Sequence, residues 1–102
     1  MYKHIVMWKL KESATGKSRK ENALTIKSEL EKLPLLIPQI GSYEVGINVS
    51  NSERSFDLAL CSEFETEDGF EAYRNHPEHT KVVEKIRSVS DQMYVVDYLS
   101  ST

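Results

Sequence analysis

The chain has 102 residues, enough for one domain with a working hydrophobic core. Apolar residues make up 39% of it and charged residues 28%, which is ordinary globular usage and argues against disordered and fibrous classes. The formal net charge of −3 gives no electrostatic reason to expect nucleic acid or an anionic membrane as a partner. The single cysteine, Cys61, cannot form an internal disulfide, so a cytoplasmic protein is expected.

The first predicted element is a strand over residues 2–10, because this stretch is rich in β-branched and aromatic side chains. Its apolar run is too short and too charged for a signal peptide or a membrane span. Both faces of the strand carry apolar residues. One face has His4, Val6, Trp8 and Leu10, and the other has Lys3, Ile5, Met7 and Lys9.

A helix is predicted next. Ser18 and Glu21 have the spacing of a capping box, in which the hydroxyl and the carboxylate satisfy backbone N–H groups of the first turn. The helix is expected to run to about Leu33, where Pro34 ends it. Its buried stripe is Ala23, Ile26, Leu30 and Leu33.

Two strands joined by a hairpin follow. Residues 40–49 alternate between apolar and polar, and the polar stretch NVSNSERS over 48–55 predicts a turn into a strand over 56–65. In the first of these strands Tyr43, Val45, Ile47 and Val49 share one face. In the second, Phe56, Leu58, Leu60 and Phe64 share one face, while Ala59 and Cys61 lie on the other.

The last third of the chain predicts two helices and a strand. A short helix over 67–75 buries Phe70 and Tyr73. A second helix begins at Pro77, because proline suits the first helical position. The final strand, MYVVDYL over 93–99, is apolar on both faces.

The element order β-α-β-β-α-α-β predicts one α+β domain over residues 1–102, with a four-stranded, mainly antiparallel sheet and helices on one face. The helices can cover only one side of the sheet. Apolar residues on the other side, such as Ile5, Met7, Ala59 and Cys61, are not expected to face water. We therefore expect a two-fold homodimer packed sheet against sheet.

Segments along nearly the whole chain resemble the stress-responsive α/β-barrel proteins, or Dabb domains. The most specific is YRNHPEH over residues 73–79. The others are KHIV (3–6), IPQI (37–40), YEVG (43–46), DLAL (57–60), FET (64–66) and VVDY (95–98). The resemblance implies a ferredoxin-like subunit that pairs with a second copy into a dimeric α+β barrel.

The resemblance also implies a candidate chemistry. One plant member of the family is a polyketide cyclase that closes a linear chain without metal or organic cofactor. Three of its four functional residues match here, as His4, Tyr73 and His79, whereas a strand-three histidine is replaced by Leu58. A small apolar ligand and no cofactor are therefore expected. The pocket walls are expected to include Val6, Trp8 and Leu58.

The corner that contains His79 has two interpretations. With Pro77 at the first helical position, His79 takes the third, where the helix dipole disfavours a cation and favours neutral imidazole. A neutral imidazole beside the Tyr73 phenol suits general base catalysis. In the structural alternative, Tyr73 packs in the core, His76 caps the helix and His79 hydrogen-bonds across the junction. His4 on its apolar strand is open to the same two interpretations.

Three functions therefore compete. The first is a small-ligand protein with acid/base chemistry, the second a non-catalytic stress-response assembly module, and the third a cofactor-free monooxygenase suggested by fold analogy alone. A cavity that touches Tyr73 and His79 would favour the first, and a filled corner with both His79 ring nitrogens bonded would favour the second. No metal site is expected, because His76 and His79 lack the spacing of zinc-binding helices.

Overall fold

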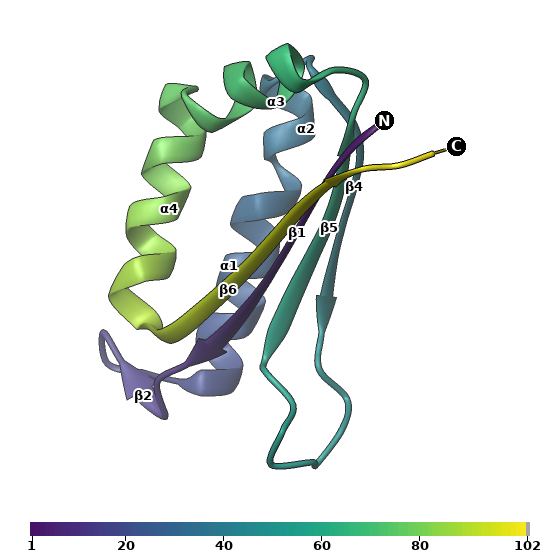
Figure 1. Ribbon diagram of the computed structural model, residues 1–102. Helices are drawn as coiled ribbons and strands as arrows, with labels where there is room; N and C mark the ends of the chain where they lie inside the picture. Colours follow the sequence, from purple (N-terminus) through teal and green to yellow (C-terminus); the bar gives the residue numbers. More distant parts are fainter. Residues whose placement is uncertain (102) are drawn as a thin grey trace.

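Four long strands form a sheet in the order β4-β5-β1-β6, and every neighbouring pair is antiparallel. The computed structural model describes residues 1–101. The helices lie together on one face of this sheet, as the sequence predicted (Figure 1). The elements are β1 (Tyr2–Leu10), β2 (Ser13–Ala14), β3 (Lys17–Ser18), α1 (Arg19–Glu31), α2 (Leu33–Leu36), β4 (Ile40–Ile47), β5 (Leu58–Phe64), α3 (Glu67–Arg74), α4 (Pro77–Val89) and β6 (Ser90–Leu99).

The capping box at the start of α1 is formed as predicted. The backbone N–H of Glu21 donates to Ser18 Oγ at 3.2 Å, and the backbone N–H of Ser18 donates to Glu21 Oε1 at 3.1 Å. The helix ends at Glu31, two residues before the predicted Leu33. Pro34 follows the C-cap of α1, Lys32, and lies in the first turn of α2, where its missing N–H would have no partner anyway.

Several strand boundaries also differ from the prediction. β4 ends at Ile47, so Val49 is fully exposed in the loop. Phe56 lies before β5 and stacks on Tyr94 of β6 at a centroid distance of 5.5 Å. β6 begins at Ser90, directly after α4, three residues earlier than expected. The short β2–β3 hairpin was not predicted.

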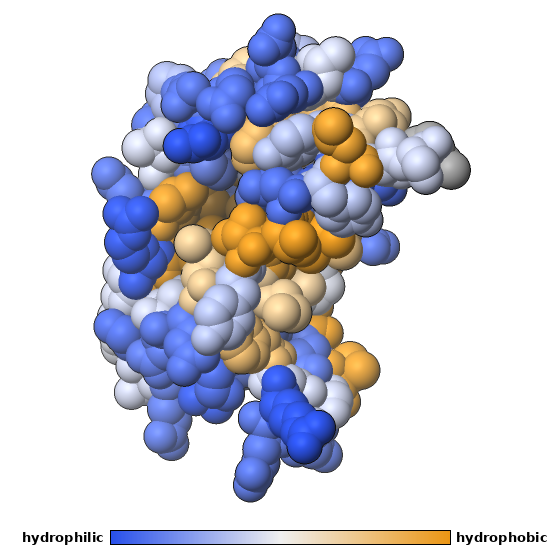
Figure 2. Space-filling view, viewed as in Figure 1, coloured by the Kyte–Doolittle hydropathy of each residue, from blue (hydrophilic) through white to orange (hydrophobic). Residues whose placement is uncertain are grey.

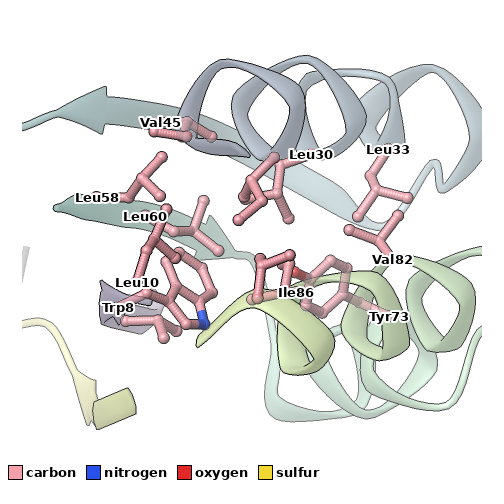
Figure 3. Packing of buried hydrophobic residues seen from close by; sticks show 14 of the residues in the cluster. Trp8, Leu10, Leu30, Leu33, Val45, Leu58, Leu60, Tyr73, Val82 and Ile86 are labelled. Atoms are coloured by element: carbon pink, nitrogen blue, oxygen red, sulfur yellow. The ribbon is translucent and has the colours of Figure 1, made fainter. Parts of the chain in front are cut away.

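The hydrophobic core lies between the helices and the inner face of the sheet (Figure 3). Each fully buried large aliphatic or aromatic side chain contributes about 1.5–3 kcal/mol. Phe64, Leu10 and Leu60 are almost completely buried, and Tyr73 of α3 packs against Phe64 at a ring-centroid distance of 4.9 Å. The core therefore sits on β1 and β5 and holds α3 in a fixed position.

The outer face of the sheet has no helix over it. Met7 is 43% exposed, and Tyr94, Val96 and Tyr98 of β6 are between 46% and 62% exposed. Cys61 is also exposed. The sequence expectation of a second, apolar sheet face is therefore correct, and this face is uncovered in the isolated chain. Among residues 1–101, no helix has the length and apolar character needed to cross a membrane.

Candidate active site

A cavity of about 700 Å³ lies between the β1–β6 side of the sheet and helices α3 and α4. The cavity exists because the helices do not cover β6, the edge strand of the sheet. Val95 and Met93 of β6 point to the helix side, but their side chains are still 46% and 56% exposed. Figure 2 shows apolar side chains over β6 and a hollow beside them toward α4. The volume is within the range of small-molecule sites. Its apolar wall includes Val6, Trp8, Leu60, Val83, Ile86 and Val95.

His79 lines this cavity from the first turn of α4. Its Nδ1 lies 3.0 Å from the backbone carbonyl oxygen of Arg74. A carbonyl only accepts, so Nδ1 carries the proton and Nε2 keeps its lone pair. Burial lowers the pKa of His79, the nearby imidazoles of His4 and His76 lower it further, and the Arg74 carbonyl partly opposes them. The side chain is therefore a neutral base near pH 7, with no partner for Nε2 among residues 1–101.

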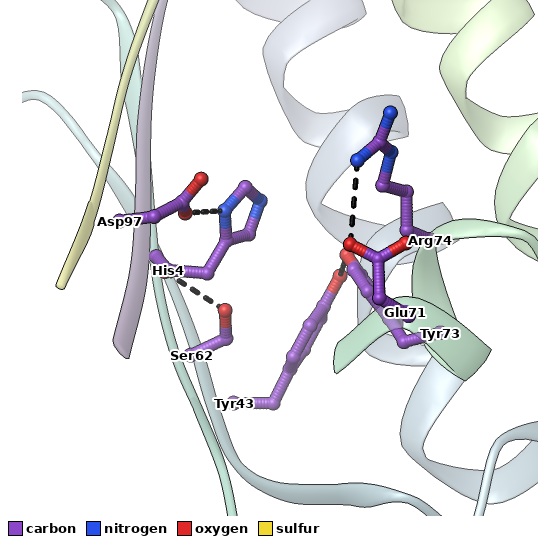
Figure 4. Close-up of polar contacts among 7 residues, drawn as sticks. All are labelled: His4, Tyr43, Ser62, Glu71, Tyr73, Arg74 and Asp97. Carbon is purple, nitrogen blue, oxygen red and sulfur yellow. Dashed lines mark hydrogen bonds and ion pairs between the residues drawn. The ribbon is translucent and has the colours of Figure 1, made fainter. Parts of the chain in front are cut away.

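His4 lines the same cavity from β1 and is paired with Asp97. The register of β1 and β6 places these residues opposite each other, and His4 Nδ1 lies 2.5 Å from Asp97 Oδ1 (Figure 4). Ser62 Oγ donates to the His4 backbone carbonyl at 2.8 Å and fixes the strand beside it. The carboxylate holds the Nδ1 proton of His4, so the other ring nitrogen is left for a ligand.

Tyr73 is buried, and its hydroxyl has a partner outside the cavity. It lies 2.9 Å from the hydroxyl of Tyr43 on β4, which does not line the cavity. Burial raises the pKa of Tyr73 to about 12, so the phenol stays protonated near neutral pH. Its ring centroid is 4.4 Å from that of His79 and 6.3 Å from that of His4. The hydroxyl therefore ties α3 to β4, and the ring packs against both histidines.

The structure brings five of the six predicted site residues to one cavity. His4, Tyr73, His79, Val6 and Trp8 all line it. Leu58 does not: it is buried in the core, where it pairs with Trp8 on one side and Ile47 on the other. The residue of β5 that lines the cavity is Leu60, two positions further along the strand.

His76 has the structural role that the sequence allowed for it. It is the N-cap of α4, and its Nδ1 accepts a hydrogen bond from the Glu78 backbone N–H at 3.1 Å. His79 does bond across the junction, as the structural interpretation expects, but through one ring nitrogen only. The corner therefore combines a structural tie with a free nitrogen beside a cavity.

Sequence reasoning missed Asp97 and Tyr43. The alternation of Met93, Val95 and Asp97 places one carboxylate on an apolar face of the last strand, which is a weak signal for a functional group. Its partner could not be named without the register between β1 and β6. The alternation places Tyr43 on the same strand face as Val45 and Ile47, but its contact with Tyr73 depends on how α3 packs.

The rim of the cavity carries charges of both signs. Glu67, Glu71 and Asp91 line it together with Arg74 and Arg87, and Arg74 forms an ion pair with Glu71 at 3.4 Å. The rim thus has no strong preference for an anion or a cation. Among the residues that the structure describes, no three His, Cys, Asp or Glu side chains are grouped as metal ligands.

Sequence comparison identifies the family of the chain. The family model described as the stress responsive A/B barrel domain matches residues 2–100. The chain therefore belongs to the stress responsive A/B barrel domain family, as its sequence motifs indicated. No curated protein matches the sequence.

Solved structures share the fold over nearly their full length. A dimeric protein of unknown function with a ferredoxin-like fold from Bacteroides fragilis is 32% identical, with a TM-score of 0.84 and coverage of 95% of this chain and 93% of that one. A dimeric ferredoxin-like protein from Thermobifida fusca is 25% identical, with a TM-score of 0.82 and coverage of 95% and 88%. A hydroxynitrile lyase from Passiflora edulis is 18% identical, with a TM-score of 0.80 and coverage of 99% and 94%. The last likeness shows the fold alone.

Proposed function

We propose that this protein binds a small, apolar carbonyl compound in the cavity and catalyses proton transfer on it without a cofactor. The observation that carries the proposal is the state of His79. One ring nitrogen is fixed by the Arg74 carbonyl, and the other keeps a lone pair that no group within residues 1–101 contacts, in a side chain that lines an apolar cavity. A base with a lowered pKa in such a place is typical of general base catalysis.

The proposed step is an enolisation. His79 Nε2 takes a proton from the carbon next to a carbonyl group, and the electron pair of that C–H bond moves to form an enolate. The negative charge on the carbonyl oxygen needs a hydrogen-bond donor. When His4 is protonated at both nitrogens, its Nε2–H is that donor, and Asp97 balances the charge on the ring. The enolate carbon can then add to a second carbonyl carbon of the same chain, as in a polyketide cyclisation. The C=O π bond of that carbonyl breaks, and its oxygen takes the proton back from His79 Nε2.

Deuterium exchange tests the step directly. The protein in D₂O is expected to accelerate the loss of the C2 protons of ethyl 3-oxooctanoate, measured by ¹H NMR at mildly acidic pD, where background exchange is slower. His79→Ala should lower the acceleration by roughly 10²–10⁴-fold, the usual contribution of a positioned acid or base. The control is His76→Ala, which removes the helix cap and leaves the base. No acceleration by the wild type, or equal rates for His79→Ala and wild type, would contradict the proposal.

We also infer that the working form is a homodimer joined through the outer sheet face. Met7, Cys61, Tyr94, Val96 and Tyr98 leave an apolar surface exposed in the isolated chain. A monomer rarely leaves a contiguous patch of this kind in water. The Bacteroides fragilis structure, at 32% identity, is described as dimeric. This supports a second copy as the cover.

Two neighbouring substitutions test the dimer. Val96→Asp places a charge on the outer face and should shift the protein to monomers in analytical ultracentrifugation. Val95→Asp places the same charge one residue away on the cavity side and should leave the dimer intact. A monomeric wild type at micromolar concentration would contradict the inference. In this proposal the dimer acts in the cytoplasm, since it needs no disulfide.

A non-catalytic assembly module is the second candidate. The observation that favours it is the Tyr73 hydroxyl, which bonds Tyr43 instead of facing the cavity. Under this alternative the dimer is the functional unit, and His79 serves only to hold the α3–α4 corner. Loss of stability in His79→Ala without any catalysed exchange in the wild type would support it.

A further inference from the structure

The ring of Trp8 is nearly buried, but its indole N–H has no hydrogen-bond acceptor among residues 1–101 and is not fully enclosed. Trp8 is only 5% exposed and lines the cavity, on the same face of β1 as His4. Its Nε1–H has no hydrogen-bond partner among residues 1–101. Every fully buried side-chain nitrogen or oxygen in those residues has a partner. The indole nitrogen is therefore not fully buried and keeps access to open space. In Figure 3 it points toward α4, the helix on the opposite wall of the cavity.

An indole N–H in this position favours a ligand that accepts a hydrogen bond. Tryptophan N–H groups usually find a partner when the ring is buried. A ligand that displaces water from this donor and leaves it unpaired loses affinity. Val6, Met93 and Ile86 line the same cavity with apolar side chains, and none of its polar lining residues, Ser90 and Gln92 included, accepts a hydrogen bond from the indole. The acceptor for this donor is therefore water or a bound ligand.

The donor is far from His4 along β1. His4 and Trp8 are four residues apart in one strand, which separates their Cα atoms by about 13 Å. A single small carbonyl group cannot contact both. Apart from its charged rim, the cavity therefore has two polar positions, one at the histidines and one at the indole, with the apolar Val6 between His4 and Trp8 on β1.

We propose that Trp8 Nε1–H forms a second subsite, and that the ligand is an elongated, apolar compound with one carbonyl at the histidines and another oxygen acceptor at the indole. This inference rests on the cavity being a ligand site, as proposed above. It adds the class of ligand: a chain with at least two oxo groups, one near each end. Trp8 then determines specificity and takes no part in proton transfer.

A pair of ketones tests the subsite. Decane-2,9-dione has an acceptor at each end, and 2-decanone has one acceptor and is more hydrophobic. The dione should bind about tenfold more tightly, because it pairs a donor that the monoketone leaves unpaired. Trp8 is the only tryptophan, so the chain has one indole N–H signal in a ¹H–¹⁵N spectrum. The dione should move this proton signal downfield, and 2-decanone should move it much less.

Substitutions separate this donor from general packing. Trp8→Phe should remove the tenfold preference while it retains binding of 2-decanone. Val83→Ala, on the cavity wall without a polar group, should weaken both ketones alike. The spectrum of the wild type decides the question even if Trp8→Phe does not fold.

The binding data distinguish failure of the Trp8 subsite from failure of the proposed carbonyl-binding function. If the dione moves backbone signals of cavity residues and leaves the indole signal unchanged, or binds no more tightly than 2-decanone, the Trp8 subsite is wrong and the cavity remains a ligand site. If neither ketone moves any cavity signal, both the subsite and the proposed carbonyl-binding function are wrong.

Discussion

The two edges of the sheet differ although both edge strands turn apolar side chains toward the helices. On the β4–β5 side, Val45, Leu58 and Phe64 are at most 4% exposed. On β6, at the other edge, Met93 and Val95 face the helices as well and are about half exposed. α1 lies against β4, where Lys27 Nζ donates to the Val45 carbonyl at 2.7 Å, whereas α4 stands away from β6 (Figure 1). Apolar residues on the helix-facing side of the sheet are therefore buried in the core at the β4 edge and form a cavity wall at the β6 edge.

The largest expected effect tests this difference through stability. Leu58→Ala on the packed side should lower the free energy of unfolding by about 2–5 kcal/mol, because it leaves a cavity in a filled core. Val95→Ala on the hollow side should cost about 1 kcal/mol or less, since its side chain is already half exposed. Urea denaturation measures both. Equal losses of unfolding free energy in the two variants would mean that the cavity beside β6 is closed in solution.

Tyr43 connects the packed edge to the site. Tyr43→Phe leaves the buried Tyr73 hydroxyl without its partner and should cost about 1–3 kcal/mol of stability. The double variant Tyr43→Phe/Tyr73→Phe should recover part of this loss, because no unpaired hydroxyl remains. The contrary outcome is a Tyr43→Phe variant that is as stable as wild type but exchanges deuterium more slowly. This result would mean that the Tyr73 hydroxyl takes part in the proton transfer in the cavity.

Asp97 is the carboxylate that β6 contributes to the hollow side. Asp97→Asn keeps the shape of the side chain and removes its charge, so the His4 ring loses its fixed orientation and charge balance. Deuterium exchange should slow by roughly tenfold or more, with little change in stability. Asp91→Asn at the cavity rim is the matched control and should exchange at the wild-type rate. An unchanged rate in Asp97→Asn would remove His4 from the proposed step.

The smallest expected effect is a pH dependence of stability. The pKa of His79 is lowered in the folded protein, mainly by burial, so the unfolded chain binds more protons between that value and the ordinary pKa of about 6.5. Stability should therefore fall as the pH drops from 7 through this window, and then lose this dependence below the folded pKa. His79→Asn should flatten the curve in thermal melts. A variant with the wild-type slope would show that His79 is solvated.

The sequence determined the order of the elements and the two-sided apolar character of the sheet. The cap at Ser18, the proline at the first position of α4, strand alternation and the turn after Ile47 are local signals. Local signals fix where helices and strands form. The family motif also pointed to His4, Tyr73 and His79, and the structure places all three at one cavity. These features depend on residues close together in the chain or on a short motif.

Only the tertiary structure decided what those side chains face. Asp97 is 93 residues from His4 and meets it through strand register, and Tyr43 meets Tyr73 through the packing of α3. Leu58 and Leu60 share one strand face, yet only Leu60 lines the cavity. The hollow itself arises because α4 does not cover the edge strand. Alternation along a strand specifies a face, but whether that face meets a helix or open space depends on contacts between distant segments.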